Sequence, residues 1–435
     1  IANVAAILPV VTSYGPAQYS CVLEGSDTYY YDSEETIYKR LFQDLKEAVE
    51  WLKDFRDSSP SQDLLDDFKR ADKVCDGDID KWIKFANTLR LRIAMQLVKV
   101  YPDSQKEAED AVRDGVLTNS DSDVVLKSGL MLFRIEDLWN DTRANANIIS
   151  ILQGYSDPRL ERWFATNNAD IYSTDDELSP VVEKATKYLG VRQGVPMTRT
   201  EYQGYSKTSR VGIPEQGPRP VLRVAEAYFL RAEGMLRNWN MGDGTPESLY
   251  NEGIHSAWAS VLGDESGWAG TYESYINGFI NTEEGGDFDW ELFEGGFGSA
   301  PYINYRNQEY NYYIEENGKQ VGINRISVRW HDEDSPEKKL QRIITQKWIS
   351  FFPTLSSVAW TEYRRTGYPK LIPIPSDLNY SNGAIDTELQ IRRLPFTQSE
   401  YRGNTEEVNK ALGLLKGPDN GGTRLWWDVD KGNFE

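Results

Sequence analysis

Residues 264–313 hold the densest set of side chains that could recognise a ligand. Thirteen of these 50 residues are aromatic, and ten Asp and Glu stand against one basic residue, Arg306. An aromatic ring can desolvate the apolar face of a sugar or pack against a peptide, while ligand hydroxyls need paired donors and acceptors. The same side chains would also suit the packing of a loop on a rigid scaffold. Both interpretations remain open for each residue.

We expect the ligand-binding side chains to come mainly from this segment. The candidates are Trp268, Trp290, Tyr302 and Tyr305 as stacking rings, Arg306, Asn304 and Asp289 as partners of hydroxyl groups, and Tyr29 and Tyr30 from an earlier loop.

Covalent chemistry finds little support in the sequence. The chain has two histidines, His255 and His331, and neither lies near a GxSxG nucleophile motif. His331 stands in an acidic turn, RWHDEDSP, which suits either a zinc site or a solvated turn before a helix. No GxGxxG or P-loop pattern precedes a plausible βα unit. We assign no catalytic residue, although the plentiful carboxylates leave a helical glycoside hydrolase as the enzyme alternative.

One short stretch resembles a calcium loop. Asp76, Asp78 and Asp80 alternate as ligands would, but Lys81 stands where such a loop needs glycine and Asn87 where it needs an acidic residue. We therefore predict no cofactor and no metal, and a structural calcium ion is possible but unsupported.

The composition limits the possible partners. The 435 residues carry a net charge of −20, which disfavours binding to nucleic acid. No run approaches the roughly 20 apolar residues that a membrane-spanning helix needs. Cys21 lacks the small-residue context of a lipoprotein cleavage site, so we expect any lipidated cysteine to lie upstream of Ile1. Cys21 and Cys75 suit either one disulfide or, as we favour, two buried thiols.

The helices that must carry these loops are clearest within 335–367. Ser335 can cap a first helix with an apolar stripe, which ends before Pro353. Thr354 can cap a second helix that stops at Gly367. So short a break predicts antiparallel helices, and such a pair buries its apolar face only by stacking on further pairs.

The same pattern recurs earlier in the chain. We predict a mainly α fold of about four tetratricopeptide-like helix pairs in a single domain spanning 1–435, with long irregular loops packed as a second layer. The helix pairs lie within 33–115, 220–263 and 335–367, and the loop-rich segments are 116–219, 264–334 and 368–435.

Several ordered motifs resemble one family. ITQKWISFF with AWTEYRRTGYPKL, WIKFANTLRLRIAM, AEAYFLRAEG and the closing Trp426-Trp427-Asp428 are similar to signatures of the SusD/RagB family, the nutrient-binding outer-membrane lipoproteins of Bacteroidetes. The resemblance runs from Tyr14 to Asp428.

The resemblance implies a cell-surface protein held to the outer membrane only by an upstream lipid anchor. It would capture an oligosaccharide, without covalent chemistry, and deliver it to a TonB-dependent, SusC-like transporter. We assign the exposed face of the helix pairs to the transporter or scaffold contact. RagB-type members imply an alternative in which the cargo is a peptide, and acidic loops at 264–313 would then favour basic peptides.

Overall fold

The computed structural model describes most of the helical scaffold. The described residues are 1–127, 142–155, 157–166, 188, 190–191, 193–194, 202, 205–208, 219–262, 272, 275–276, 314–316, 319–321, 324, 326–374 and 376–435.

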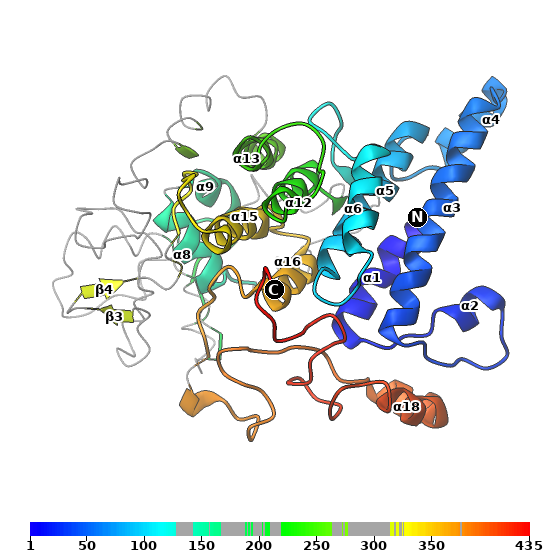
Figure 1. Cartoon of the computed structure of the whole chain (residues 1–435). Helices are drawn as coiled ribbons and strands as arrows, with labels where there is room; N and C mark the ends of the chain where they lie inside the picture. The colour runs from blue at the N-terminus through cyan, green and yellow to red at the C-terminus, as the bar shows by residue number, and fades with distance from the viewer. Residues whose placement is uncertain are drawn as a thin grey trace.

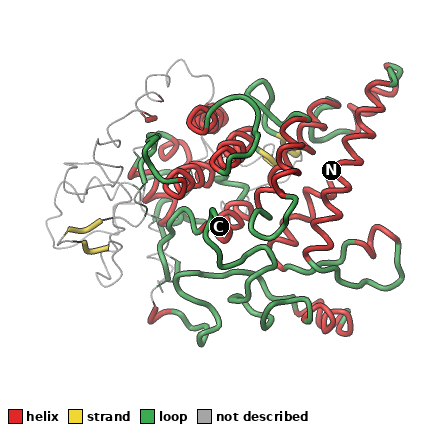
Figure 2. Tube along the Cα trace, in the orientation of Figure 1, coloured by secondary structure: helices red, strands yellow, loops and turns green. Residues whose placement is uncertain are grey.

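Within these residues the structure is mainly helical, which confirms the predicted fold class (Figures 1 and 2). The α-helices are α1 (Ala2–Tyr14), α2 (Ser20–Glu24), α3 (Glu34–Asp57), α4 (Gln62–Ala71), α5 (Ile79–Gln96), α6 (Ser104–Arg113), α8 (Ala146–Gly154), α9 (Arg159–Trp163), α12 (Val224–Leu236), α13 (Pro246–Leu262), α15 (Pro336–Ser350), α16 (Ser356–Thr366), α17 (Gln398–Gly403) and α18 (Thr405–Leu412). A 3₁₀ turn, η5, spans Ser376–Leu378.

Two small antiparallel strand pairs accompany the helices among the described residues. Strand β1 (Val124–Leu126) pairs with β2 (Arg219–Leu222), and β3 (Ile314–Glu316) pairs with β4 (Lys319–Val321). The second pair lies apart from the helices in Figure 1.

Helices that follow one another in the sequence pack together, and the resulting pairs stack. Helix α3 contacts α5, α5 contacts α6, α12 contacts α13, and α15 contacts α16. Helix α12 links the stack because it also contacts α5 and α15. Gly253 of α13 allows a close approach to α12, since a Cβ there would lie 2.7 Å from the Phe229 ring. The predicted helix-pair architecture is thus formed through small contact residues.

The ends of α15 and α16 follow local signals, with one exception. Ser335 accepts a hydrogen bond from the Lys338 amide at 3.3 Å, as predicted for its cap. Gly367 adopts φ 77°, the left-handed conformation that favours glycine after a helix. The prediction that Thr354 caps α16 is wrong, because the cap position is Leu355 and the Thr354 hydroxyl is buried without a partner.

In the described part of segment 116–219, two helices, α8 and α9, form where the sequence shows no sustained helical period. Helix α8 (Ala146–Gly154) is the clearer case. Its apolar residues Ile148, Ile149, Ile151 and Leu152 are all buried, so several sides of the helix meet the core. Such a helix lacks a polar face, and therefore lacks the periodic signal of an amphipathic one.

The first helix contacts a segment from the C-terminal part of the chain. The Leu394 amide donates to the Ser13 carbonyl at 2.7 Å, and Trp427 is fully buried. Trp427 therefore anchors the C-terminal segment to the core. In the described part of the chain, no helix is both long and apolar enough to cross a membrane.

Candidate binding site

Most of the sequence-predicted ligand residues fall on parts of the chain that the structure leaves undescribed. Outside the described residues lie Trp268, Asp289, Trp290, Tyr302, Asn304, Tyr305 and Arg306. Their roles therefore stay predictions.

Tyr29 and Tyr30 lie on the loop after α2. Tyr29 is 55% exposed, and its carbonyl accepts a hydrogen bond from Asn404 at 2.7 Å. The Tyr30 hydroxyl donates to Glu24 at 3.2 Å, and its carbonyl accepts from the Cys21 thiol at 3.2 Å. The Tyr29 ring thus remains accessible while its backbone is held in place.

The alternating aspartates have structural partners. Asp78 caps α5, Asp76 pairs with Lys127, and Asp80 pairs with Arg56 at 2.7 Å. Among the residues the structure describes, no group of three or more His, Cys, Asp or Glu is placed to hold a metal ion. Cys21 and Cys75 are both buried free thiols, as favoured from the sequence.

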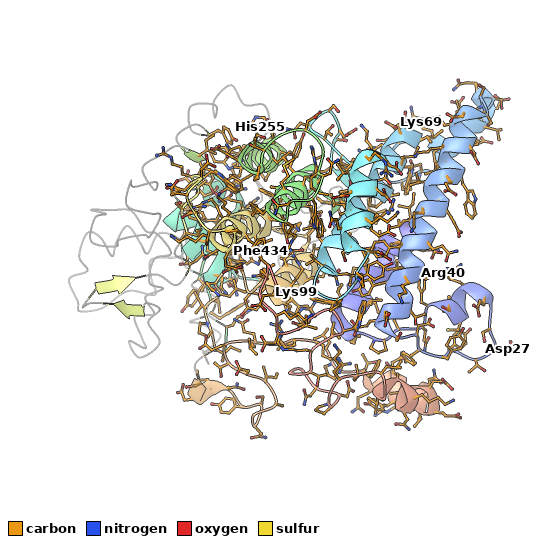
Figure 3. All side chains as sticks on the ribbon, in the orientation of Figure 1. Asp27, Arg40, Lys69, Lys99, His255 and Phe434 are labelled. Atoms are coloured by element: carbon orange, nitrogen blue, oxygen red, sulfur yellow. The ribbon has the colours of Figure 1, made fainter. Side chains whose placement is uncertain are left out.

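The acidic turn around His331 is tied to α15 and to its own backbone. Asp334 accepts a hydrogen bond from Arg342 at 2.8 Å, and Asp332 accepts one from the Trp330 indole at 3.0 Å. His331 Nδ1 lies 3.3 Å from Glu333. The second histidine, His255, lies on α13 (Figure 3). These contacts support the interpretation as a turn that precedes a helix.

A pocket of about 570 Å³ opens between the α15–α16 pair and the segment 371–394. This volume lies within the range of roughly 300–1,000 Å³ that is typical of small-ligand sites. Its lining combines aromatic and aliphatic side chains with a few polar ones. The aromatic lining residues are Trp348, Phe351, Phe352, Trp360 and Tyr363.

The Trp360 ring is fixed from two sides. The Arg364 guanidinium lies 3.6 Å from the centroid of the Trp360 ring and 4.8 Å from that of Trp427, so one cation contacts both tryptophans. The Trp360 indole N–H donates to the Ile391 carbonyl at 3.0 Å. These contacts hold the pocket wall in one orientation before any ligand binds.

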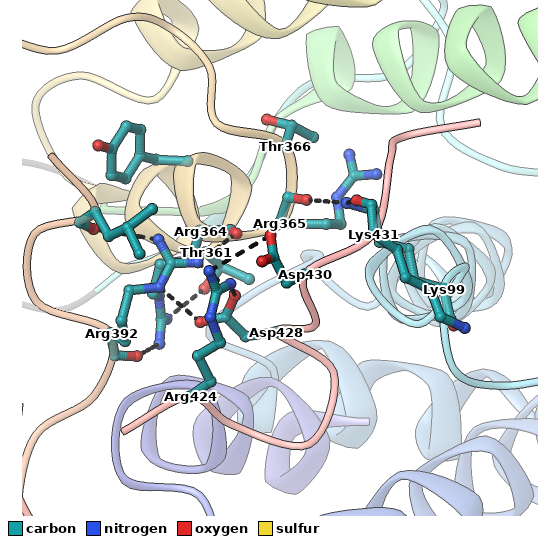
Figure 4. Close-up of polar contacts among 12 residues, drawn as sticks. Lys99, Thr361, Arg364, Arg365, Thr366, Arg392, Arg424, Asp428, Asp430 and Lys431 are labelled. Atoms are coloured by element: carbon teal, nitrogen blue, oxygen red, sulfur yellow. Dashed lines mark hydrogen bonds and ion pairs between the residues drawn. The ribbon is translucent and has the colours of Figure 1, made fainter. Parts of the chain in front are cut away.

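The Arg364 side chain is in turn held by a polar network (Figure 4). It donates to the Arg392 carbonyl at 2.7 Å, and Arg392 donates to Asp428 at 2.8 Å. Arg424 lies 3.1 Å from the same carboxylate. The C-terminal segment thereby supports the back of the pocket.

The helix α16 is anchored to the scaffold by buried charges. Arg365 donates to Glu233 of α12 at 2.6 and 2.7 Å and to Glu362 at 2.6 Å, and Lys347 of α15 lies 3.1 Å from Glu362. Burial alone would raise the pKa of the Glu233 carboxyl, but the guanidinium groups of Arg365 and Arg237 outweigh it and lower that pKa. Glu233 therefore stays ionised and links α12 to α16.

The rim of the pocket is apolar and acidic. Ile391 and Leu394 line the pocket and are 41% and 37% exposed. Between residues 371 and 391 the sequence carries Asp377, Asp386 and Glu388 and no Lys or Arg.

Only partial signals for this pocket are present in the sequence. Trp348, Phe351 and Phe352 belong to the apolar stripe of the first helix predicted within 335–367. Phe351 is buried, whereas Trp348 and Phe352 remain half-exposed at the pocket. The exposed apolar residues after 371 follow the period of neither a helix nor a strand, and this was a usable sign of the pocket.

Stacked helix pairs that carry a ligand-sized pocket define a helical binding protein. The family model described as "Susd and RagB outer membrane lipoprotein" matches residues 1–272 and 297–428. The chain therefore belongs to the SusD-like family of outer-membrane lipoproteins, whose members are binding proteins and not enzymes.

Solved structures agree with this assignment. A chitin-binding SusD homologue from Flavobacterium johnsoniae is 36% identical, with a TM-score of 0.80, over 98% of this chain and 79% of that one. A SusD homologue from Bacteroides vulgatus is 32% identical, with a TM-score of 0.79, over 99% of this chain and 78% of that one. Another from Bacteroides uniformis is 30% identical, with a TM-score of 0.78, over 98% and 80% of the two chains. Among curated proteins, none matches the chain.

Proposed function

We propose that this protein captures an oligosaccharide at the cell surface and delivers it to a TonB-dependent, SusC-like transporter. A lipid anchor upstream of Ile1 holds it to the outer membrane with the binding loops facing outward. The observation that carries the glycan assignment is the 36% identity, over 98% of this chain, to a SusD homologue that binds chitin. Chitin oligomers are therefore the first ligands to test.

The ligand contacts come from the aromatic segment 264–313. Trp268, Trp290, Tyr302 and Tyr305 stack on the apolar faces of sugar rings, while Asp289, Asn304 and Arg306 pair with hydroxyl groups. Tyr29 and Tyr30 are secondary candidates, and the accessible Tyr29 ring supports including them. An N-acetylated sugar presents both an apolar face and amide groups, which suits a site that mixes aromatic and polar side chains.

Calorimetry against chitin oligomers and a panel of other glycans tests the proposal. We expect saturable binding between about micromolar and about millimolar, or roughly −8 to −4 kcal/mol. A reducing-sugar assay on the same samples should detect no release of product. Binding should change little with salt, because a neutral glycan carries no charge.

Two substitutions locate the site. Trp290→Ala and Tyr305→Ala should each weaken glycan binding, whereas Trp51→Ala should not. Trp51 is the matched control, since it is 69% exposed on α3 and lies far from the segment in sequence. Unchanged affinity in both segment variants would contradict the placement of the site, and silence on every glycan would contradict the proposed cargo.

Transporter association needs a separate readout. Alanine substitutions at exposed positions of the helix pairs should reduce co-purification with the transporter and leave glycan affinity unchanged. Loss of both properties in the same variants would contradict the separation of the two surfaces.

A further inference from the structure

Residues 277–323 connect two stretches of the chain that pack on the helices. We call the described residues of 272–276 the entry stem and those of 324–330 the exit stem. Six of the nine ligand candidates lie between the two stems, among them Trp290 and Tyr305. The contacts of the stems therefore decide how the scaffold holds the chain on either side of these side chains.

The entry stem is bonded to three parts of the scaffold. The Tyr272 hydroxyl donates to the Asn251 carbonyl of α13 at 2.9 Å. Tyr275 is 5% exposed, and its hydroxyl donates to the Asp157 carboxylate at 2.9 Å. The same hydroxyl accepts a hydrogen bond from the Gln346 amide of α15 at 3.0 Å. The entry stem is thus tied to α13, to α15 and to the turn before α9.

The carboxylate that accepts from Tyr275 is itself fixed. Asp157 forms a two-pronged ion pair with Arg159, whose Nε and Nη2 atoms lie 2.9 and 2.5 Å from its carboxylate oxygens. Neither side chain has exposed surface. A buried charge is stable only while its partner stays in place, so this ion pair gives the entry stem a rigid support.

The exit stem is held through its backbone. Its described residues form no helix or strand, so its buried carbonyls depend on side chains for their hydrogen bonds. The hydroxyl of Tyr155, directly after α8, donates to the Ile326 carbonyl at 2.8 Å. The Tyr250 hydroxyl of α13 donates to the Val328 carbonyl at 2.6 Å. Two tyrosines of the scaffold thus supply partners that a strand would otherwise provide.

Tyr155 also joins the two stems. Its ring meets that of Tyr275 edge to face, with 6.4 Å between the centroids and 87° between the planes. Its hydroxyl accepts a hydrogen bond from Asn324 of the exit stem at 3.4 Å. The helices that supply these groups contact one another, α8 with α9, α9 with α13 and α13 with α15 (Figure 1). Both ends of residues 277–323 are therefore fixed at one buried place.

Neither tyrosine is placed to contact a ligand. Tyr155 and Tyr275 are each 5% exposed. Burial raises the pKa of both hydroxyls, so they stay protonated and keep donating to Ile326 and Asp157. An effect of either hydroxyl on ligand binding must therefore act through the stems.

We propose that Tyr155 and Tyr275 are positioning residues of the glycan site, which hold both ends of residues 277–323 so that the sugar-binding side chains are ordered before the ligand binds. This inference rests on the proposed function, because that proposal places most ligand contacts between the stems. Ordering a chain segment at the moment of binding lowers the affinity, and a segment whose ends are already fixed avoids part of this cost. The two hydroxyls thus contribute to affinity without contacting the sugar.

Three tyrosine-to-phenylalanine variants of the full chain test the proposal. Tyr155→Phe and Tyr275→Phe each remove one hydroxyl from the stems and keep the ring. Tyr38→Phe is the matched control, because the Tyr38 hydroxyl is also buried and accepts a hydrogen bond from Gln96 at 2.7 Å, on α3. Thermal unfolding should show that all three variants fold, with similar losses of stability.

The first readout is calorimetry with a chitin hexamer. The affinity should fall by about three- to tenfold in Tyr155→Phe and in Tyr275→Phe, the cost of ordering one or two further groups on binding. It should stay unchanged in Tyr38→Phe. A purely structural role would lower the stability of all three variants and leave the affinity of all three alike.

The second readout needs no ligand. Arg306 is the only Lys or Arg within 264–313, so tryptic cleavage after Arg306 reports on that segment. Mass spectrometry of timed digests should show faster cleavage there in Tyr155→Phe and Tyr275→Phe, because proteolysis follows local opening of the chain. The rate in Tyr38→Phe should equal that of the wild type.

Several results would overturn the proposal. These are unchanged cleavage and affinity in both stem variants, changes of the same size in Tyr38→Phe, and weaker binding without faster cleavage. Faster cleavage with unchanged affinity would limit the two hydroxyls to stabilising the fold. If the hexamer does not bind, or if Trp290→Ala and Tyr305→Ala leave its affinity unchanged, the proposed function fails, while the cleavage rates still decide whether the stems hold the segment.

Discussion

The two sides of the α15–α16 helix pair differ in the way they treat charged and apolar side chains. Toward α12 the pair buries charges, where Arg365, Glu362 and Lys347 meet Glu233 with almost no exposed surface. Toward the segment 371–394 the pair leaves aromatic rings at an open pocket. At these two places charged residues lie inside and aromatic rings reach the surface, the reverse of the usual distribution.

The two sides of the pair therefore have different roles. The α12 side stabilises the fold, and the pocket side is open for binding. On the α12 side each charge has an opposite partner, so removing one partner leaves another stranded in a low-dielectric interior. On the pocket side Ile391 and Leu394 are more than a third exposed, so removing one of them should cost little folding energy. Stability and recognition should therefore respond to different substitutions in the same two helices.

Removing the central cation of the buried network should give the largest effect. Arg365→Met leaves Glu233 and Glu362 without their shared partner, and we expect a loss of about 3–5 kcal/mol of unfolding free energy. Urea denaturation measures it. The exposed pair Lys39–Glu35 provides the control, since Lys39→Ala removes a solvent-screened ion pair and should change the unfolding free energy little. A loss below that of the control would mean that the network does not hold α16.

The two tryptophans that contact Arg364 should contribute unequally to the stability of the fold. Trp427 is fully buried, so Trp427→Ala should cost about 3–5 kcal/mol through the cavity that it leaves. Trp360 is half-exposed at the pocket, and Trp360→Ala should cost only about 1–2 kcal/mol, including its contact with the cation. Thermal and urea unfolding of both variants compares them. Equal losses would place Trp360 with the core and not with the binding surface.

The buried carboxyl of Glu34 accepts a hydrogen bond from a single backbone amide and has no ion-pair partner among the described residues, unlike the paired charges toward α12. Burial raises the pKa of Glu34 from 4.5 to about 7, against the Trp426 amide and more distant cations, and its Oε2 has no partner. The Glu34 carboxyl therefore binds a proton more tightly in the folded state than in the unfolded state. The contribution of Glu34 to the free energy of unfolding is therefore fully present below pH 4.5 and is lost as the pH rises through about 7.

The corresponding variant is Glu34→Gln. At about 1.4 kcal/mol per pKa unit, the wild type should lose about 3 kcal/mol across this window, and the variant should lose much less. Urea unfolding at a series of pH values from 4 to 8 measures the slope. Parallel slopes for the two proteins would show that Glu34 ionises normally in the folded state.

The smallest effect is expected at the pocket rim. Ile391→Ala should change stability by no more than about 0.5 kcal/mol, because the residue is 41% exposed and lies outside the core. The same truncation at Ile343, which is fully buried on α15, should cost about 2–5 kcal/mol. A similar loss at both positions would mean that the segment 371–394 closes over the core and not over a binding pocket.

The helices were predictable where the signals are local. Ser335, Pro336 and Gly367 fix the outer ends of the α15–α16 pair through capping and backbone preference, which depend on a few neighbouring residues. The start of α16 was missed at Thr354 because its hydroxyl turns into the interior instead of toward the helix amides. Helix α3 is capped by Ser33, whereas the neighbouring Asp32 accepts a hydrogen bond from the Ser20 amide.

The binding surfaces were harder to predict from the sequence than the helices. Of the predicted ligand residues, only Tyr29 and Tyr30 lie within the described structure, and Tyr29 keeps an accessible ring. The pocket at α16 was not predicted, because it needs a segment without regular structure to fold back over Trp360. Periodicity identifies a helical face but not what covers it.

By itself the sequence determined the helix pairs, the acidic surface and the family, since these follow from spacing, composition and ordered motifs. Only the tertiary structure decided which charges lie inside. Arg364 and Arg365 occupy the last turn of a helix, where sequence alone favours exposure, yet one lies between two tryptophans and the other binds Glu233, 132 residues away in the chain. A charge is stable in the interior only when partners from distant segments converge on it, and that convergence is a property of the folded chain.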